Sequence, residues 1–444
     1  MIPVMTPLSL KFKRVISGKI FILVNFFKSY PEIMKRIATG RGYIPLLTLI
    51  AVWSMSLVVD LPGLAISPLI SVIDKVFPGA THLECQLLEI LPNFCIFPFI
   101  LLSGKLSMSR NKVGLVVVGL VVFLLAGIAY FFVDSILGLI IVSCILGMGC
   151  GLVIPLAAGL LAEIFTGRYR LEQMGIKSGI ANGTLVLATL AVGLIEGKNW
   201  HLPFVVYLLP VVPLVMSVFL SRRFLSANGG SDVATPVQAH IKSAGLPAGV
   251  VRRRIMGIIF FYLVVTISGI TLSFFIPFLM SAHHMSDDAT GYVSAVFYLM
   301  VTLPGFFLGK IVCGLRRSTI PVCISMMIVG PLIIAFCPSL TAYFIGASLM
   351  GFGYGALQPI FYDKASELAP SAAHSTRVLS YVMSANYIGV AVCPLFFVGL
   401  NSVVAFVISA ACMAVVLVVA ILRRHSFTFS VDDELAAYGK KHLD

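Results

Sequence analysis

Charged residues are scarce in this sequence. Asp, Glu, Lys and Arg make up 11% of its 444 residues, whereas hydrophobic residues make up 59%. A soluble protein of this length cannot bury so much apolar surface, which excludes soluble folds. At about 20 residues per bilayer crossing, the chain holds material for roughly a dozen spans with short loops. The composition therefore predicts an integral membrane protein.

The sequence also lacks the residue patterns of several kinds of site. Its nine cysteines include no Cys-x-x-Cys pair, and its eight histidines lie in predicted loops, tails or span edges. Neither a disulfide framework nor a metal site is expected. A solvated loop accounts for His283, His284, Asp287 and Asp288 better than a cation site does. We expect no cofactor, no nucleic-acid binding and no enzymatic activity, because no cluster of catalytic groups lies at one depth.

Twelve apolar segments separated by polar or glycine-rich breaks predict transmembrane helices. They fall at about 44–70, 86–103, 113–133, 136–165, 174–195, 202–220, 255–280, 290–313, 318–337, 339–366, 377–400 and 401–422. The long polar stretch between the sixth and seventh segments predicts a linker. The expected domains are a leader over 1–42, a first bundle over 43–221, a linker over 222–254, a second bundle over 255–422 and a tail over 423–444.

Lys and Arg are unevenly distributed between the two sides of the predicted membrane. With the N-terminus inside, 29 of the 31 fall on the cytoplasmic side, including the three that follow the fourth span, Arg168, Arg170 and Lys177. Only Lys75 and Lys198 fall outside. The positive-inside rule then predicts a protein of the cell membrane with both termini cytoplasmic. The basic leader predicts an amphipathic segment lying on the membrane surface, rather than a cleaved signal peptide.

The second half of the chain repeats residues of the first. At an offset of 204, a shared pattern of glycines, a proline, a glutamate and an Ala-Asn pair recurs: Gly147, Gly149, Gly151, Pro155, Glu163, Ala181 and Asn182 match Gly351, Gly353, Gly355, Pro359, Glu367, Ala385 and Asn386. Gly104 and Lys105 match Gly309 and Lys310 at an offset of 205. The repetition predicts an all-α membrane protein of two pseudo-symmetric six-helix bundles, an arrangement found in transporters.

Twelve spans in two sixes, a basic linker and a repeated Gly-Lys turn together resemble the major facilitator superfamily. The segment from Gly104 to Lys112 is similar to the family's loop motif Gly-x-Leu-x-Asp-Arg-x-Gly-Arg, although Met108 and Asn111 replace its Asp and second Gly. The resemblance implies a fold of twelve helices, a monomer, and a cytoplasmic gate held by charges.

Because the motif lacks its Asp, other charges near the cytoplasmic ends of the spans would have to form this gate. The residues expected there are Gly104, Lys105, Arg110, Glu163, Arg168, Lys310, Glu367 and Arg377, with Arg170, Arg316 and Arg317 nearby. Exposed ion pairs contribute only about 0 to 1 kcal/mol each, so a network is needed. The alternative is that these charges simply mark the membrane edge.

Asp60-Leu61-Pro62-Gly63 in the first span resembles a signature of the twelve-span drug:proton antiporter branch of this superfamily. This resemblance implies export. Two other signatures of the branch are missing, because Ser143 stands where an Arg is usual and the fifth span, Gly175 to Ile195, lacks the glycine-proline pattern.

Two acidic residues fall inside predicted spans. A charge at the depth of Asp60 costs about 2.5 to 3.5 kcal/mol, so we expect this carboxyl group to face a cavity or a partner rather than lipid. In so apolar a place it would retain a proton more readily than in water, as a proton carrier must. Glu89, nearer the outer interface, is a second candidate that could share the proton. No basic residue is expected at mid-membrane depth, so no buried ion pair is expected. The alternative is that Asp60 only aids packing.

Polar and aromatic residues at similar depth are candidates for contacts with a substrate. They are Trp53, Asn182, Tyr262, Phe275, Tyr298, Tyr354, Gln358, Tyr362 and Asn386. Ordinary helix packing is the alternative for each of them. Because this set is mostly uncharged and aromatic, it favours an uncharged, amphipathic or cationic substrate.

The sequence thus predicts a secondary transporter that moves a small organic molecule by alternating access, driven by protons, with export favoured. Its partners would be the substrate, protons and the lipid bilayer. The alternatives are proton-coupled or facilitative uptake of a nutrient, and a membrane sensor or enzyme that kept the fold without transporting.

Overall fold

The computed structural model describes residues 36–40, 42–62, 69, 72–73, 76–79, 82–108, 111–195, 200–220, 248–397 and 399–422. Predictions for residues 1–35, Arg110, the linker over 221–247 and the tail over 423–444 lie outside this part of the chain, as do those for the side chains of Glu89, Asp287 and Asp288. Within the described residues the protein is helical, apart from one two-stranded antiparallel sheet.

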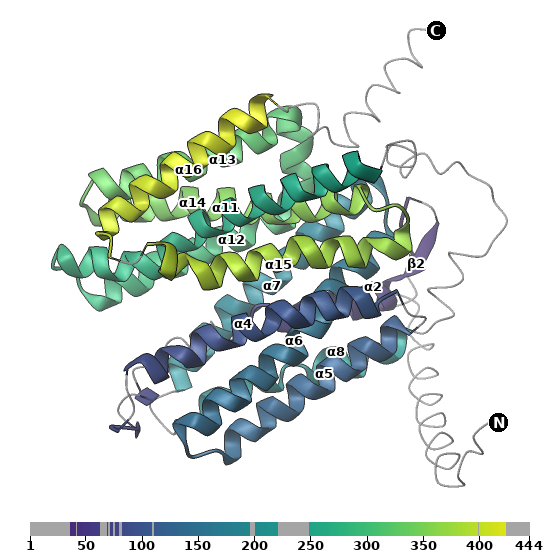
Figure 1. Ribbon diagram of the computed structural model, residues 1–444, viewed down its shortest axis with the longest axis horizontal. Coiled ribbons are helices and arrows are strands. Elements are labelled where there is room, and N and C mark those ends of the chain that lie inside the picture. The colour runs from purple at the N-terminus through teal and green to yellow at the C-terminus, as the bar shows by residue number, and fades with distance from the viewer. Residues whose placement is uncertain are drawn as a thin grey trace.

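The first half of the chain holds β1 (Arg36–Ala38), β2 (Tyr43–Pro45), α2 (Leu46–Ser54), η2 (Met55–Val58), α4 (His82–Leu106), α5 (Lys112–Ala129), η4 (Tyr130–Phe132), α6 (Ile136–Ile164), α7 (Gly167–Ile195), η5 (Leu202–Leu208), α8 (Val211–Met216) and η6 (Ser217–Phe219). The η elements are short 3-10 helices. The second half holds α11 (Ala248–Ala282), α12 (Asp287–Leu315), η7 (Arg316–Ser318), α13 (Thr319–Phe336), α14 (Leu340–Glu367), α15 (Ala372–Phe396) and α16 (Ser402–Leu422). In Figure 1, α4, α5, α6 and α8 of the first half lie on one side of the molecule, and α11 to α16 lie on the other.

The helices are consistent with the twelve predicted spans. Among the described residues, nine helical stretches are long and apolar enough to cross a membrane, and one of them, Ala289–Phe336, contains both α12 and α13. Two shorter apolar helices, Leu46–Val58 and Ile90–Leu106, coincide with the first and second predicted spans. Most helix ends lie within a few residues of the prediction. The exceptions are α7, which begins at Gly167 rather than near residue 174, and α11, which begins at Ala248, inside the predicted linker, rather than near residue 255.

Matched residues in the two halves make equivalent contacts. Ser135 and Ser339, which are 204 residues apart, cap α6 and α14, and each hydroxyl accepts a hydrogen bond of 3.2 Å from the backbone N–H three residues later. A Cβ atom added to Gly147 would lie 2.5 Å from the backbone oxygen of Pro92, and one added to Gly351 would lie 2.5 Å from that of Phe297. Glycine therefore permits the same close approach of helices in both halves, which supports the duplication predicted from the sequence.

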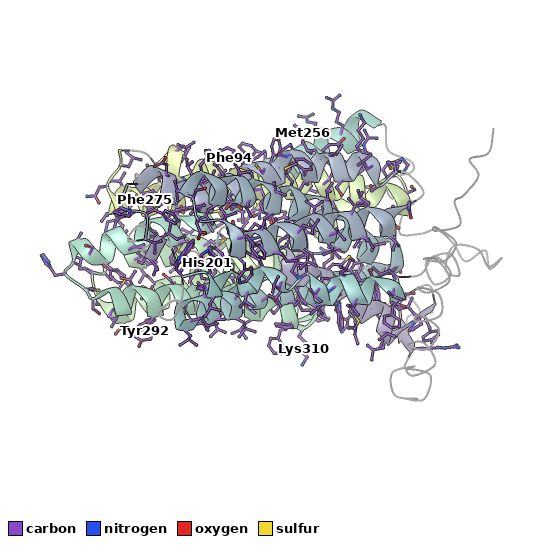
Figure 2. The ribbon with its side chains drawn as sticks, turned by 90° about the horizontal axis from the view of Figure 1, so that it is seen from below. Phe94, His201, Met256, Phe275, Tyr292 and Lys310 are labelled. Atoms are coloured by element: carbon purple, nitrogen blue, oxygen red, sulfur yellow. The ribbon has the colours of Figure 1, made fainter. Side chains whose placement is uncertain are left out.

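The outer surface of the bundle is apolar, as a lipid-facing surface must be. Phe94, Met256 and Tyr292 are 45%, 57% and 67% exposed. Figure 2 shows Phe94 and Met256 on one side of the bundle and Tyr292 on the opposite side. Outward-facing aromatic and aliphatic side chains on opposite sides are those expected of a bundle surrounded by lipid.

The short sheet connects the start of the described chain to α7. Strands β1 and β2 pair in register Ile37 with Ile44, and Gly40 in the turn between them has a φ of +83°. The backbone N–H of Thr166, one residue before α7, donates to the Thr39 carbonyl over 3.0 Å. Residues 36–40 and 42–45, at the boundary between the expected leader and the first span, therefore belong to a hairpin that contacts the start of α7.

Candidate functional site

A cavity lies where the two halves of the chain meet. The space between its lining side chains is about 520 Å³, part of which is open solvent. The lining comes from both halves of the chain and combines one carboxyl group with amides, tyrosines and aliphatic groups: Asp60, Asn93, Asn182, Leu185, Ile270, Phe297, Tyr298, Val301, Tyr354, Gln358, Asn386, Tyr387 and Val390.

Asp60 lines this cavity just beyond the end of a helix. The 3-10 helix η2 ends at Val58, and the chain turns before Pro62. The hydroxyl of Tyr387, on α15 in the other half, lies 3.2 Å from Asp60 Oδ1 and 3.1 Å from the Val59 carbonyl, and donates to them. The carboxyl group thus faces a cavity and a partner, as the sequence predicted.

Lys177 overturns the expectation that no basic residue lies at this depth. Because α7 begins seven residues earlier than the predicted span, Lys177 is an interior residue of the helix and is only 2% exposed. Its ammonium interacts electrostatically with Asp60 and Cys150, and its Nζ lies 5.2 Å from the centre of the Tyr362 ring. Among the described residues it forms no direct ion pair or hydrogen bond. The distribution of Lys and Arg had instead predicted Lys177 to lie on the cytoplasmic side, after the fourth span.

Two hydrogen-bond networks hold the polar lining in place. In the first, Asn182 Nδ2 donates to Gln358 Oε1 over 3.3 Å, and Gln358 Nε2 donates to the Tyr362 hydroxyl over 3.4 Å. That hydroxyl lies 2.8 Å from the hydroxyl of Tyr262. The first network joins α7 of one half to α14 and α11 of the other.

The second network is centred on the amide of Asn386. Asn386 Oδ1 accepts hydrogen bonds of 3.0 Å from both Thr266 and Tyr354. It connects α11, α14 and α15 within the second half. The two asparagines matched across the repeat, Asn182 and Asn386, therefore both reach the cavity.

Four predicted substrate residues do not line the cavity. Trp53 donates to Gln173 Oε1 over 3.0 Å, and Phe275 packs against Phe397 with ring centres 5.5 Å apart. Tyr262 and Tyr362 are buried behind the lining, where they contact each other. The cavity does include Asp60, Asn182, Tyr298, Tyr354, Gln358 and Asn386. A substrate role stays a prediction for every member of the predicted set.

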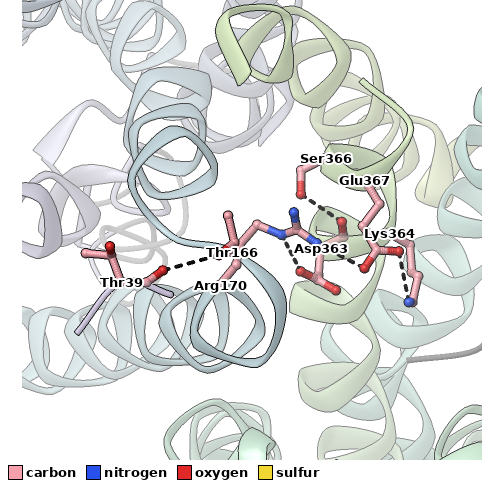
Figure 3. Close-up of polar contacts among 7 residues, drawn as sticks. All are labelled: Thr39, Thr166, Arg170, Asp363, Lys364, Ser366 and Glu367. Atoms are coloured by element: carbon pink, nitrogen blue, oxygen red, sulfur yellow. Dashed lines mark hydrogen bonds and ion pairs between the residues drawn. The ribbon is translucent and has the colours of Figure 1, made fainter. Parts of the chain in front are cut away.

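A second polar cluster joins the halves at the end of the bundle where α7 begins and α14 ends (Figure 3). Arg170 on α7 forms ion pairs with Asp363 and Glu367 on α14, at 2.7 Å and 3.0 Å. Lys364 pairs with Glu367 at 3.1 Å. The Arg170 and Asp363 side chains are 4% and 1% exposed. This ion-pair cluster consists of Arg170, Asp363, Lys364 and Glu367.

Of the residues predicted at or near a charged gate, Glu367 and Arg170 belong to the ion-pair cluster. Glu163 pairs with Lys112 and Arg168 with Glu172, in each case within the first half. Arg377 donates to the Tyr381 hydroxyl on its own helix. Their participation in a gate stays a prediction.

The matched glycines of the loop motif do lie between the halves. Gly104 packs against Ser380 on α15, and Gly309 packs against the side chain of Glu172 on α7. The lysines that follow them, Lys105 and Lys310, are exposed. In each Gly-Lys pair, the glycine makes the contact between the halves and the lysine side chain is exposed.

The sequence carried signals for two of the residues that were missed. Asp363 precedes Glu367 by four residues, so both acids lie on one face of a helix and can share a cation. Tyr387 directly follows the matched Asn386. No motif pointed to the pairing of Arg170, whose partner Asp363 is 193 residues away in sequence.

Among the described residues, no group of three His, Cys, Asp or Glu side chains could hold a metal ion.

Comparisons with known proteins agree on the fold. Residues 258–434 match the family model of the Major Facilitator Superfamily. A structure of the proton:xylose symporter XylE covers 88% of this chain and 98% of its own, with 13% identity and a TM-score of 0.68. One of the human organic anion transporter MFSD10 covers 86% and 97%, with 15% identity and a TM-score of 0.61. No curated protein sequence matches the chain.

These matches concern transporters rather than enzymes, and they do not select the drug:proton antiporter branch. The described helices, the duplicated contacts and the cavity between the halves are all features of the same architecture. The chain is an all-α membrane protein with the fold of the major facilitator superfamily transporters, and its second half matches the model of that family.

Proposed function

We propose that this protein is a proton-coupled secondary transporter of a small organic molecule, with Asp60 as the residue that takes up and releases the proton. The observation that supports this most directly is the position of Asp60. It is the one carboxyl group in the described lining of a cavity formed by both halves, and Tyr387 of the second half hydrogen-bonds to it. Its protonation can therefore alter a contact between the halves.

Alternating access requires that a contact between the halves break and re-form in each cycle. The ion-pair cluster meets this requirement, because Arg170 belongs to one half and both its carboxylate partners belong to the other. We propose that it acts as the gate at this end, which the distribution of Lys and Arg predicts to be cytoplasmic.

The direction of transport follows from how proton and substrate share the cavity. A substrate that competes with the proton for Asp60 moves against it, as in export driven by an inward proton gradient. A substrate that binds together with the proton moves with it, as in uptake. Export stays the prediction from the first-span resemblance, and uptake is its alternative.

The test uses purified protein in liposomes that enclose a pH-sensitive dye. A substrate identified by its stabilisation of the protein should move the internal pH as it crosses the membrane, and the sign of that change gives the direction. Asp60→Asn should retain exchange of labelled substrate for unlabelled substrate, while accumulation driven by a pH gradient is lost.

Asp134→Asn is the matched control, because this carboxyl group is 81% exposed and lies outside the cavity. It should behave like the wild type. Accumulation by Asp60→Asn at the wild-type level would remove Asp60 from the coupling mechanism. If no member of a broad compound panel stabilises the protein or crosses the membrane, a sensor or another non-transporting role takes the place of transport.

A further inference from the structure

A buried cation lies close to the cavity, in addition to the carboxyl group of its lining. Lys177 lies behind the lining, against Tyr362, and interacts electrostatically with Asp60 without a direct ion pair to it. The sequence-based choice of substrate class assumed that no cation lay here. The buried cation therefore bears on which charge a substrate in this cavity can carry.

A buried ammonium without a direct partner is costly, since burial removes its water shell and only an opposite charge or hydrogen bonds offset that loss. Among the described residues, other groups that interact with Asp60 or Lys177 come from three neighbouring helices, and each of them is normally uncharged. They are Cys150 on α6, Tyr354 and Tyr362 on α14, and Tyr387 on α15. Asp60 is therefore the only described carboxylate available to offset the charge of Lys177 in the empty cavity.

Protonation of Asp60 removes this compensation. A proton that adds to the carboxylate leaves a neutral acid within the field of Lys177, and the positive charge behind the lining is then uncompensated. Lysine carries its charge on a flexible chain of four carbons and can therefore change partners. The group that can take the place of the Asp60 carboxylate is a negative charge on the substrate.

We propose that the substrate is a small organic anion, such as a carboxylate, that binds to Lys177 while Asp60 carries a proton. This inference rests on the proposed transport function and names its substrate class. One proton enters with each negative charge, so the loaded cavity has the same net charge as the empty one. The anion and the proton occupy the cavity together and therefore move in the same direction, so the protein would be a symporter, and this inference selects the uptake alternative over export.

The proposal can be tested by the thermal stability of the purified wild-type protein in the presence of matched compounds. Small organic acids are each paired with the amine and the alcohol of the same carbon skeleton, benzoate with benzylamine and benzyl alcohol among them. The measurements are made at about pH 5.5 and about pH 8. Acids should stabilise the protein more than their amines or alcohols do, and more strongly at the lower pH.

Three variants separate the roles of the two charges. Lys177→Met should weaken binding of the acids by about 30-fold or more, and Arg253→Met, which removes an exposed cation on α11, should not change it. Asp60→Asn imitates the protonated acid, so its binding of the organic acids should depend less on pH than that of the wild type. This last result does not depend on whether Lys177→Met folds.

Other outcomes overturn the inference and leave transport standing. Stabilisation and flux of amines or alcohols without acids would show a transporter of another substrate class. Acid binding that is unchanged in Lys177→Met would show that Lys177 is not the binding cation. Acid binding by Asp60→Asn that keeps the wild-type pH dependence would separate the proton from the anion. Failure of every compound class to bind or cross the membrane would instead reject the proposed function itself.

Discussion

Two buried cations on the same helix are held in different ways. Arg170 and Lys177 lie seven residues apart on α7, about two helical turns, and are 3% and 2% exposed. Arg170 makes direct ion pairs with two carboxylates of the other half. Lys177 has one carboxylate in its field and, among the described residues, no direct ion pair. Burial alone therefore does not indicate what a charge does.

The difference follows from the chemistry of the two side chains. A guanidinium presents several N–H donors in a planar fork and can bind two carboxylates at once, which suits a contact that joins two bodies. An ammonium is a compact charge on a flexible chain, which suits an exchange of partners. We interpret Arg170 as the cation that joins the halves and Lys177 as the cation that responds to what the cavity contains.

The duplication sharpens this contrast. At the offset of 204, the positions that match Arg170 and Lys177 in α15 are His374 and Tyr381. The glycine contacts and the serine caps recur in both halves, but these two buried cations belong to α7 alone. Duplication supplied the scaffold, and the charges of one copy make the two halves chemically different.

The largest expected effect comes from removing Arg170. Arg170→Met leaves Asp363 buried without its main partner, and breaking a buried ion pair from one side destabilises a protein by about 3 to 5 kcal/mol. Unfolding by dodecyl sulfate in mixed micelles, followed by circular dichroism, measures the loss. A double variant with Asp363→Asn should recover part of it. Wild-type stability of Arg170→Met would show that these ion pairs do not hold the halves together.

A smaller loss is expected for Arg170→Lys. The charge remains, but an ammonium in place of the fork cannot keep both bonds, at 2.7 Å to Asp363 and 3.0 Å to Glu367. The loss of one charge-assisted hydrogen bond corresponds to about 1.5 to 3 kcal/mol. The same unfolding measurement should place this variant between the wild type and Arg170→Met. A result equal to the wild type would mean that charge alone, and not the fork, closes this end.

The contrast also shows where sequence reasoning succeeds and where it fails. The described membrane helices and the contacts repeated in the two halves could be predicted because apolar runs and matched glycines are local patterns that a sequence displays directly. Asp60, Asn182 and Asn386 could be found as polar residues inside such runs, and all three line the cavity.

The start of α7 could not be predicted in the same way. Its first turn carries Arg168 and Arg170, so a search for apolar runs begins the span too late, and Lys177 then falls at the edge of the predicted span instead of well inside the helix. Arg170 is stabilised by α14, which is remote in sequence, and Lys177 by the field of Asp60 on another segment. Polar residues that are compensated by distant partners look like loop residues until the helices are placed side by side.

Lys177→Met should change stability little, within about 1 kcal/mol, although it removes a charge that is as deeply buried as Arg170. The buried ammonium is itself costly, and Asp60 can become neutral by binding a proton when its counter-charge is lost. The micelle unfolding assay provides the comparison, with Lys310→Met as the matched exposed lysine. A loss as large as that of Arg170→Met would make Lys177 a structural cation and remove the distinction drawn between the two residues.

The smallest effect is expected at Arg168, two residues before Arg170 on the same helix. Arg168 pairs with Glu172 at 2.8 Å one turn later, but the two side chains are 46% and 32% exposed, so solvent screens the pair. Such helical pairs contribute no more than about 0.5 kcal/mol. Arg168→Met should therefore unfold almost with the wild type, and added salt should reduce even that small difference. Both arginines precede the predicted span, but only Arg170 reaches the other half. A large loss of stability in Arg168→Met would therefore mean that positive charge at this end controls stability, rather than the ion pairs to α14.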